Sequence, residues 1–467
     1  MLPTGKFFLF FALTLASIAP PAMAQQDDQL IERGKYLATA GDCIACHTVA
    51  GGKSFAGGLV LPTPVGNIVS TNITPSKTQG IGNYTLEDFS KAMRQGVAPG
   101  GRHLYPAMPY TAYALVSDDD IAAMYAYFMH KVEPVDTAAP QTRLPFPFNI
   151  RASMAAWNLL FLDKAAFQAD PEKGDVWNRG AYLSRGLAHC ATCHTPRNFL
   201  MDEDESRALG GAYVGPWLAP NITSDEHSGI GTWSTEEIVA YLKTGRVHGK
   251  AQAAGAMAEA IDNSLKHLTD NDLNAMAVYL KSVPAVRGQD QEKSAYAWGA
   301  PADELASIRG KPLPEDPNQM TGAQLYDAEC ASCHQAQGEG SRGLPSLFHN
   351  SGVGRLDTNN LVMVILDGIH RGPVNDASGT LMPGYRDTLS DTQIATLGTY
   401  LVQHFGNPDA KVTADQVAQL KTGAMAGPDL VRLARIAMAA GLAIVLLLIA
   451  ALLTRRARRR RRSLRTV

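Results

Sequence analysis

Three copies of one motif, Cys-x-x-Cys-His, constrain this 467-residue chain more than any other feature. They occur as CIACH at 43–47, CATCH at 190–194 and CASCH at 330–334, and together they contain all six cysteines. In each copy the two thiols stand about one helical turn apart, and an imidazole follows the second thiol. The fold must therefore present the same set of sulfur and nitrogen groups three times.

Four kinds of chemistry use paired cysteines, and the spacing discriminates between them. Disulfides do not require a histidine after each pair. Zinc needs four ligands, and each motif stands without a second cysteine pair. A thioredoxin-like redox pair needs a βαβ context, which the helical patterns around the motifs do not provide. Covalent c-type haem uses every position, because two thiols form thioethers with the vinyl groups and the histidine ligates the iron.

The motifs therefore predict three covalently bound haem c groups. Because no Rossmann glycine pattern, G-x-S-x-G or P-loop occurs in the sequence, we expect no substrate-oxidising site on the chain. The expected thioether residues are Cys43, Cys46, Cys190, Cys193, Cys330 and Cys333. The expected proximal ligands of the iron are His47, His194 and His334.

The chain also repeats itself around the motifs. A helical stretch leads into each one, and a capped amphipathic helix closes each region, as in SDDDIAAMYAYF, TDNDLNAMAVYL and SDTQIATLGTYL. The first two regions share an Asn-Ile-Thr loop, which we interpret as a structural turn and not as a glycosylation site. A capping box follows the loop, at Thr85/Asp88 in the first region and at Ser234/Glu237 in the second. We expect an all-α fold of three tandem class I cytochrome c-like domains, at 26–148, 174–288 and 319–407, with proline-rich connections between them. The apolar stretch 151–167 is expected to form a helix, for which packing between the first two domains is favoured over docking on a partner.

The second axial ligand of each iron must come from a loop downstream of the motif. Met108, in YPAMPY, and Met382, in LMPGY, lie beside prolines that fix such loops before the closing helix. Met257 stands at a similar distance from its motif but lacks a flanking proline, and His248 and His267 are nearby alternatives. We predict Met108, Met257 and Met382 as the distal ligands.

The two ends of the chain predict export and anchoring. Lys6, an apolar run and Ala-Met-Ala before Gln25 are typical of a signal peptide over residues 1–24. Residues 436–453 are 18 uncharged, mostly apolar residues, and the tail 454–467 contains eight arginines. These features predict one transmembrane helix with a cytoplasmic arginine-rich tail and the haem domains on the periplasmic side. Without Lys6 and the tail, 33 basic residues face 44 acidic ones, a charge of −11 that disfavours nucleic acid as a partner.

Several longer phrases carry a family resemblance over about residues 30–405. With the three motifs, FAGGLVLPTPVGNIVSTNITP, GRHLYPAMPY, GIGTWSTEEIVAYLKTGR and LMPGY resemble the triple-haem cytochrome c subunit of membrane-bound periplasmic dehydrogenases of bacteria. The resemblance implies His/Met ligation by His47/Met108, His194/Met257 and His334/Met382. Ala256 departs from the family pattern, which has a proline before the second methionine.

The resemblance also implies a function. The chain is expected to accept electrons from a large flavin- or pyrroloquinoline-quinone-dependent subunit that oxidises an alcohol, gluconate or a sugar alcohol, and to pass them to ubiquinone in the cytoplasmic membrane. A small third subunit is a further candidate partner. Two alternatives stay open at this point: an independent multihaem enzyme (a peroxidase or a thiosulfate-oxidising cytochrome), and the cytochrome subunit of a terminal oxidase.

Overall fold

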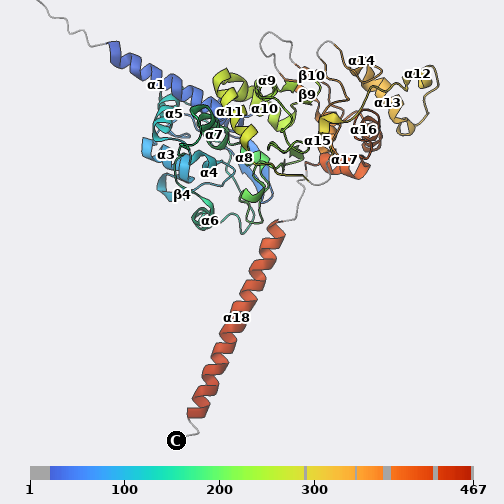
Figure 1. Ribbon diagram of the computed structural model, residues 1–467. Coiled ribbons are helices and arrows are strands. Elements are labelled where there is room, and N and C mark those ends of the chain that lie inside the picture. The colour runs from blue at the N-terminus through green and yellow to red at the C-terminus, as the bar shows by residue number, and fades with distance from the viewer. Residues whose placement is uncertain (1–20, 289–291, 342–343, 372–379, 424–429, 464–467) are drawn as a thin grey trace, which may run out of the picture.

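The computed structural model is mostly helical and describes residues 21–288, 292–341, 344–371, 380–423 and 430–463. Figure 1 shows a globular body from which one long helix, α18 (Leu430–Ser463), projects. Of the predicted signal peptide, residues 1–20 lie outside the described residues. The last four of its residues begin the first helix, α1 (Pro21–Ala40).

The first motif belongs to a run of elements from α1 to α5, here called the Cys43 segment. The motif itself forms a short helix, and hairpins and two further helices separate it from the closing helix. The elements after α1 are α2 (Cys43–His47), β1 (Val60–Thr63), β2 (Gly66–Val69), α3 (Leu86–Gln95), β3 (Val97–Ala98), β4 (Arg102–His103), α4 (Tyr110–Tyr113) and α5 (Asp118–His130).

The second motif lies in a run of closely similar order, the Cys190 segment, which follows the connecting helix α6 (Ser153–Phe161). Its elements are α7 (Asp175–Tyr182), α8 (Cys190–His194), β5 (Ala212–Val214), β6 (Trp217–Ala219), α9 (Thr235–Thr244), β7 (Arg246–Val247), β8 (Ala251–Gln252), α10 (Gly255–Asn263) and α11 (Asp270–Ser282).

The third motif lies in a shorter run, the Cys330 segment, with one small helix on either side. Its elements are α13 (Gly322–Glu329), α14 (Ala331–His334), α15 (Asn359–Asp367), β9 (Ile369–Arg371), β10 (Thr380–Met382) and α16 (Asp391–Phe405). The flanking helices are α12 (Leu305–Ile308) and α17 (Ala414–Lys421).

Five two-stranded antiparallel sheets occur among the described residues, and the expected all-α fold did not include them. They pair each odd-numbered strand with the next one, from β1–β2 to β9–β10. Each strand has only two to four residues, which is too short for an alternating pattern to stand out in the sequence. The hairpins do not build the core, which is made by helices.

One helix crossing recurs in all three segments. The first helix of each segment presents a glycine to the closing helix, and a Cβ added to Gly34 or Gly180 would lie 1.9 Å from a backbone oxygen of that helix. At Gly322 the added atom would lie 2.3 Å from Tyr400 Cβ. The two backbones can approach this closely only because glycine has no side chain. The crossing partner includes the tyrosine of each closing motif: Tyr127, Tyr279 and Tyr400.

The predicted helix starts are confirmed. The Thr85 hydroxyl accepts a hydrogen bond from the backbone of Asp88 and the Asp88 carboxylate accepts one from the backbone of Thr85. Ser234 and Glu237 make the same reciprocal pair at the start of α9. These caps satisfy amide groups that the first turn of a helix leaves without partners.

The hydrophobic core is divided unevenly among the segments. One cluster of buried side chains runs from Leu37 through the Cys43 and Cys190 segments to Val283. A second cluster, from Leu305 to Leu420, belongs to the Cys330 segment and its two flanking helices. The first two segments therefore share one core, and the third has its own.

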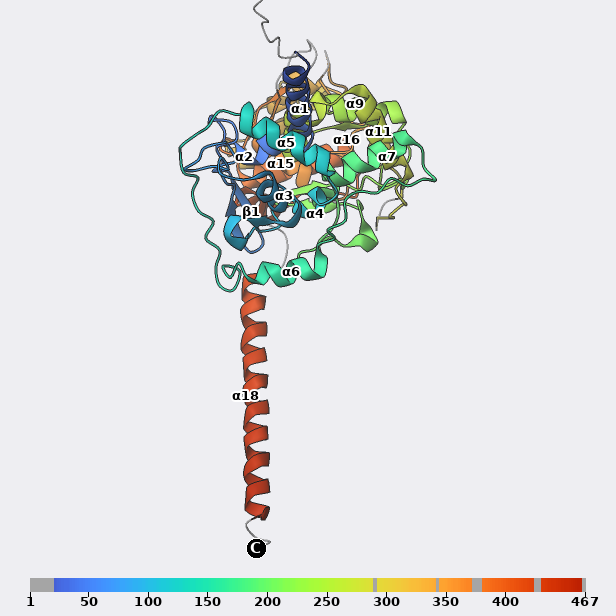
Figure 2. The same ribbon diagram turned by 90° about the vertical axis from the view of Figure 1, so that its left-hand side faces the viewer.

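The expectation for residues 151–167 is only partly met. The helix runs over Ser153–Phe161, and Asn158 is its one buried residue. The Leu159 and Leu160 side chains are 87% and 68% exposed, so this helix does not bury its leucines between the first two segments. Figure 2 shows α6 on the side of the body from which α18 departs.

The C-terminal helix is long and apolar enough to cross a membrane. Its candidate span, Leu430–Ala457, has 28 residues and none of its most apolar window is buried. At about 1.5 Å per residue this span is about 42 Å long, more than a hydrocarbon core requires. The predicted span 436–453 lies inside it.

Candidate haem sites

The three motifs form similar local structures. In the first two, both cysteines and the histidine lie on one short helix, α2 or α8, whereas in the third Cys330 directly precedes α14, which holds Cys333 and His334. The residue before the first two helices has a left-handed backbone, with φ of 51° at Asp42 and 36° at His189. All six cysteines are free thiols. The chain thus enters two of the motif helices through a sharp turn that sequence analysis did not predict.

The motif histidines are oriented in the same way at all three sites. The Nδ1 atom of His47 lies 2.6 Å from Thr71 O, that of His194 lies 2.6 Å from Pro220 O, and that of His334 lies 3.0 Å from Pro345 O. A carbonyl oxygen can only accept, so Nδ1 must carry the proton and donate it. Nε2 is then the unprotonated nitrogen that can bind a metal, as in most metal-ligating histidines.

Burial supports the same protonation state. It lowers the pKa of His47, His194 and His334, while the bond to the carbonyl raises it by less. The imidazoles therefore stay neutral at neutral pH. A neutral imidazole is the form that ligates iron.

The Asn-Ile-Thr loops explain how two of these carbonyls are positioned. Asn72 is buried, its side-chain oxygen accepts from the backbone and hydroxyl of Thr74, and its amide donates to Val135 O at 2.7 Å. Asn221 makes the equivalent bonds, with Val286 O at 2.6 Å. Each asparagine follows directly after the residue whose carbonyl accepts from the motif histidine. The structural interpretation of these loops is supported, since a buried amide that donates to the backbone cannot bear a glycan.

Cys43 is buried, four of the cysteines are partly buried and Cys333 is exposed. Burial raises the pKa of Cys43, Cys190 and Cys330 to about 12. The first and second motifs are linked by Tyr113, whose ring packs edge-on against His189, 5.7 Å between centroids, and whose hydroxyl donates to Gly41 O.

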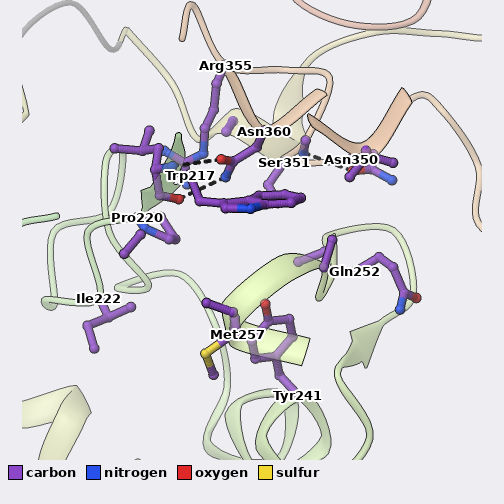
Figure 3. Close-up of a pocket in the computed structure, with 18 of the residues that line it drawn as sticks. Trp217, Pro220, Ile222, Tyr241, Gln252, Met257, Asn350, Ser351, Arg355 and Asn360 are labelled. Carbon is purple, nitrogen blue, oxygen red and sulfur yellow. Dashed lines mark hydrogen bonds between the residues drawn. The ribbon is translucent and has the colours of Figure 1, made fainter. Parts of the chain in front are cut away.

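The second and third motifs line one continuous cavity. Cys190, Cys193 and His194 contribute to one part of its wall, and Cys330 and His334 to another. Figure 3 shows Trp217 opposite Met257 and Tyr241 across part of this cavity, with Arg355 and Asn360 arriving from the Cys330 segment. The wall is mainly apolar, as a porphyrin requires.

Two of the three predicted methionines line a cavity with their motifs. Met108 packs against the core cluster that the first two segments share. Met257 and Met382 line the cavity together with the motif residues of their own segments. Met382 ends strand β10, but Met257 lies in the first turn of helix α10 and not in a loop. A helix holds this side chain in place without the proline that the sequence lacks.

The two histidines considered as alternatives to Met257 do not line the cavity. His248 is exposed and lies in the turn between β7 and β8. His267 is also exposed, and its Nε2 lies 3.1 Å from Asp262 O. Met257 is therefore the best-placed ligand for an iron bound to His194.

Two polar residues of the cavity were missed by sequence reasoning. Arg355 and His227 both line it, and burial lowers the pKa of Arg355. His227 Nδ1 is buried and lacks a hydrogen-bond partner among the described residues. Haem has two carboxylate side chains, and a cation and a ring N–H are suitable partners for them. The sequence gave no sign of their position, because Arg355 lies outside the repeated phrases and the first copy of the loop that holds His227 has Thr78 at the equivalent place.

Taken together, the residues present fit haem c. Each site supplies two thiols and a histidine with Nε2 available. The two sites that share the cavity also supply an apolar wall and a thioether sulfur facing the same space. The first site has the same proximal geometry, with Met108 packed against the same core.

Comparison with known proteins identifies the same chemistry. The cytochrome c family model matches residues 31–131 and 319–405, which contain the first and third motifs. The chain is 46% identical over 426 residues to the fructose dehydrogenase cytochrome subunit of Gluconobacter japonicus, covering 89% of this chain and 87% of the relative. It is 40% identical to the gluconate 2-dehydrogenase cytochrome c subunit of Pantoea cypripedii, over 89% of this chain and 95% of the relative. It is 39% identical to the cytochrome c subunit of the quinone-type alcohol dehydrogenase of Gluconobacter oxydans, over 85% of this chain and 83% of the relative.

Proposed function

Because the chain belongs to the family of cytochrome c subunits of dehydrogenase complexes, we propose that it relays electrons from a catalytic dehydrogenase subunit to ubiquinone. The relay uses three haem c groups, one at each motif. When bound, haem c supplies a reversible one-electron iron couple. The chain's own residues attach, orient and insulate it.

The observation that carries this proposal is the contiguity of the three motifs. Tyr113 links the first two motifs, since its ring packs against His189 and its hydroxyl donates to Gly41 O, and the second and third motifs line one cavity. The second site is thus adjacent to both others. A continuous series of closely spaced one-electron sites suits a relay better than an enzyme with one reaction centre.

The proposed ligand pairs are His47/Met108, His194/Met257 and His334/Met382. The Nδ1 bond to a backbone carbonyl fixes each imidazole, and Met257 is the cavity-lining candidate of its segment. Methionine on the distal side fills the position where oxygen or peroxide would bind and raises the potential. Three closed irons favour electron transfer over the peroxidase and oxidase alternatives.

We further propose the domain and membrane arrangement that this role needs. The chain forms three cytochrome c domains, at residues 26–148, 174–288 and 319–407. The recurrence of the glycine crossing and of a short helix at each motif supports this division. Helix α18 is the membrane anchor, with the arginine tail in the cytoplasm and the haem domains in the periplasm. The substrate class of the partner is an alcohol, gluconate or a sugar, as in the relatives.

Purification of the tagged chain from its native membranes in mild detergent tests the partner. We expect a flavin- or quinone-dependent dehydrogenase to copurify, and a haem assay to give three haems per chain. Reduction of the haems by the partner's substrate would then identify the substrate class. A chain that carries three haems but copurifies with no dehydrogenase would contradict the proposal.

The distal ligand of the second site has its own test. In Met257→Ala the reduced protein should bind about one carbon monoxide per chain, because the iron opposite His194 loses its thioether. His248→Ala and His267→Ala are matched controls and should leave the visible spectrum unchanged. Carbon monoxide binding to the parent protein, or a spectral change in either histidine variant, would refute the Met257 assignment.

A further inference from the structure

An apolar patch lies on the side of the body from which α18 departs. It comprises residues 146–161, including α6, and the neighbouring loop residues 199 and 200. Its exposed members include Leu159, Leu160 and Phe199, the last of which is 84% exposed. The Trp157 indole donates to Leu200 O at 2.9 Å and joins the two parts into one surface. Such a set of large exposed side chains marks a contact site.

The patch lies level with the first turns of α18. Arg435 Nε donates to Phe146 O at 3.0 Å, so the anchor helix contacts the edge of the patch one residue before its uninterrupted apolar run begins at Ile436. Figures 1 and 2 both show α6 beside the point where α18 leaves the body. If α18 spans a bilayer from this point, α6 is at the depth of the lipid headgroups.

The α6 part of the patch carries little charge. Residues 146–161 contain one basic side chain, Arg151, and no acidic one, and the second part of the patch is followed by four acidic residues at 202–205. Exposed leucine and phenylalanine side chains beside a tryptophan, on a helix with little charge, are typical of surfaces that lie in the interface of a bilayer.

The patch is connected directly to the first haem site. Asn158 of α6 is buried, accepts from the Tyr110 hydroxyl at 2.8 Å and donates to Gln95 O at 3.0 Å. The Tyr110 backbone amide in turn donates to Met108 O at 2.7 Å. The polar face of α6 therefore holds the loop that carries the distal methionine, while its leucines point away from the core.

We propose that residues 146–161 and 199–200 form a second membrane contact, in which a lipid surface covers the exposed leucines and phenylalanines. This inference rests on the proposed role of α18 as an anchor. With two contacts the body is fixed in orientation, and the Met108 loop is held at the bilayer surface. A protein partner is disfavoured at this place because it would have to occupy the space of the headgroups next to α18.

Site-directed spin labelling of the complete, haem-loaded chain tests this contact. The six native cysteines are expected to be consumed by haem, so a single added cysteine can be labelled alone. Three variants suffice: Leu159→Cys in the patch, Leu447→Cys in α18 as the positive control, and Leu313→Cys as the negative control. The native side chains at 447 and 313 are 70% and 63% exposed, and residue 313 follows α12, which Figure 1 places far from α18.

The chain is placed in bilayers of phosphatidylethanolamine and phosphatidylglycerol, and collisions of the label with oxygen and with a water-soluble nickel chelate are compared. We expect oxygen collisions to dominate at 159 and 447, and nickel collisions at 313. Dominant nickel collisions at 159 with oxygen at 447 would overturn the second contact and leave the anchor intact. Dominant nickel collisions at both 159 and 447 would overturn the proposed anchor as well. Protection of 159 only when the dehydrogenase subunit is added would assign the patch to the partner instead.

Discussion

The Cys43 and Cys190 segments are joined in a different way from the Cys190 and Cys330 segments. The first junction is a shared core. Its polar bonds occur twice, at equivalent positions of the internal repeat. The second junction contains a cavity lined by two haem motifs and is closed by bonds that occur once. The first pair of segments is built to be one body, and the third is held against it around its cofactors.

The first junction uses a reciprocal exchange of tyrosines. Asp272, at the start of α11, accepts two bonds of 2.8 Å from Arg179 of its own segment and one of 2.6 Å from Tyr36 of the other. At the equivalent position Asp120 pairs with Arg33 of its own segment and accepts from the Tyr182 hydroxyl at 2.5 Å. Because Arg-Gly-x-Tyr and the aspartate both repeat, the same contact forms twice.

The second junction is centred on Arg371. Its side chain is 4% exposed and donates to both oxygens of Asp262 and to Thr244 O at 2.8 Å. Asn360 pairs with the backbone of Leu218, accepting from N and donating to O at 2.8 Å each. None of these residues belongs to a repeated phrase.

The largest effect should come from the helix crossings. In Gly180→Ala the new Cβ would stand 1.9 Å from Ala275 O, so α7 and α11 must separate, and we expect a loss of about 4 kcal/mol or more in unfolding free energy. Gly174→Ala is the control, since no atom lies within 4 Å of its added Cβ and its φ is −71°. Denaturant unfolding followed at the haem bands measures both.

The same experiment tests whether the two bodies unfold separately. Gly322→Ala should destabilise the Cys330 segment alone, whereas Gly180→Ala should lower the transition of the first two segments together. A single transition that shifts equally in both variants would show that all three segments unfold as one unit, and the comparison would fail.

A smaller effect is expected at the second junction. Among the described residues, Arg371→Leu leaves Asp262 with only Lys266 as a cationic partner, and we expect a loss of about 2 to 3 kcal/mol, confined to the contact of the Cys330 segment. Arg309→Leu removes an exposed arginine that pairs with Asp327 and should have a much smaller effect, because water screens an exposed pair. Hydrogen exchange of α15 is the measurement. Equal exchange in the two variants would mean that Arg371 does not close the junction.

The contrast between the junctions also explains what the sequence could predict. Local features were accessible: the motif helices, the caps at Thr85 and Ser234, and the closing helices all depend on residues a few positions apart. The motif histidines could be named because haem chemistry fixes their spacing, and the structure agrees in the orientation of their rings. Met108, Met257 and Met382 stay predictions as distal ligands, and the helical position of Met257 was not expected.

Long-range contacts were not accessible. Tyr36 and Asp272 are 236 positions apart, and nothing in either phrase shows that the tyrosine reaches the other segment. Burial of the α6 leucines was favoured over docking on a partner, because an apolar helix usually packs into a core. Only the tertiary structure shows that Leu159 and Leu160 are exposed.

A still smaller effect should follow from removing one hydroxyl of the first junction. Tyr182→Phe deletes a bond to the buried Asp120 carboxylate, and we expect a loss of about 2 kcal/mol in unfolding free energy of the first two segments. Tyr125→Phe is the control inside one segment, because its hydroxyl donates to the neutral carbonyl of Tyr84, and should cost about 1 kcal/mol. Identical losses in the two variants would indicate that the exchanged tyrosine adds nothing particular to the junction.

The smallest effect is the alkaline dependence of that same bond. Burial, and then the bond to Asp120, raise the pKa of Tyr182 to about 12 from its ordinary value near 10. The folded state thus keeps a proton that the unfolded chain loses, so this stabilisation is complete below pH about 10 and disappears as the pH rises toward about 12. The difference in unfolding free energy between the parent and Tyr182→Phe should therefore shrink over that range. A difference that stays constant from neutral to strongly alkaline pH would mean that the hydroxyl is not held by the carboxylate, and the reciprocal exchange would then not be what joins the first two segments.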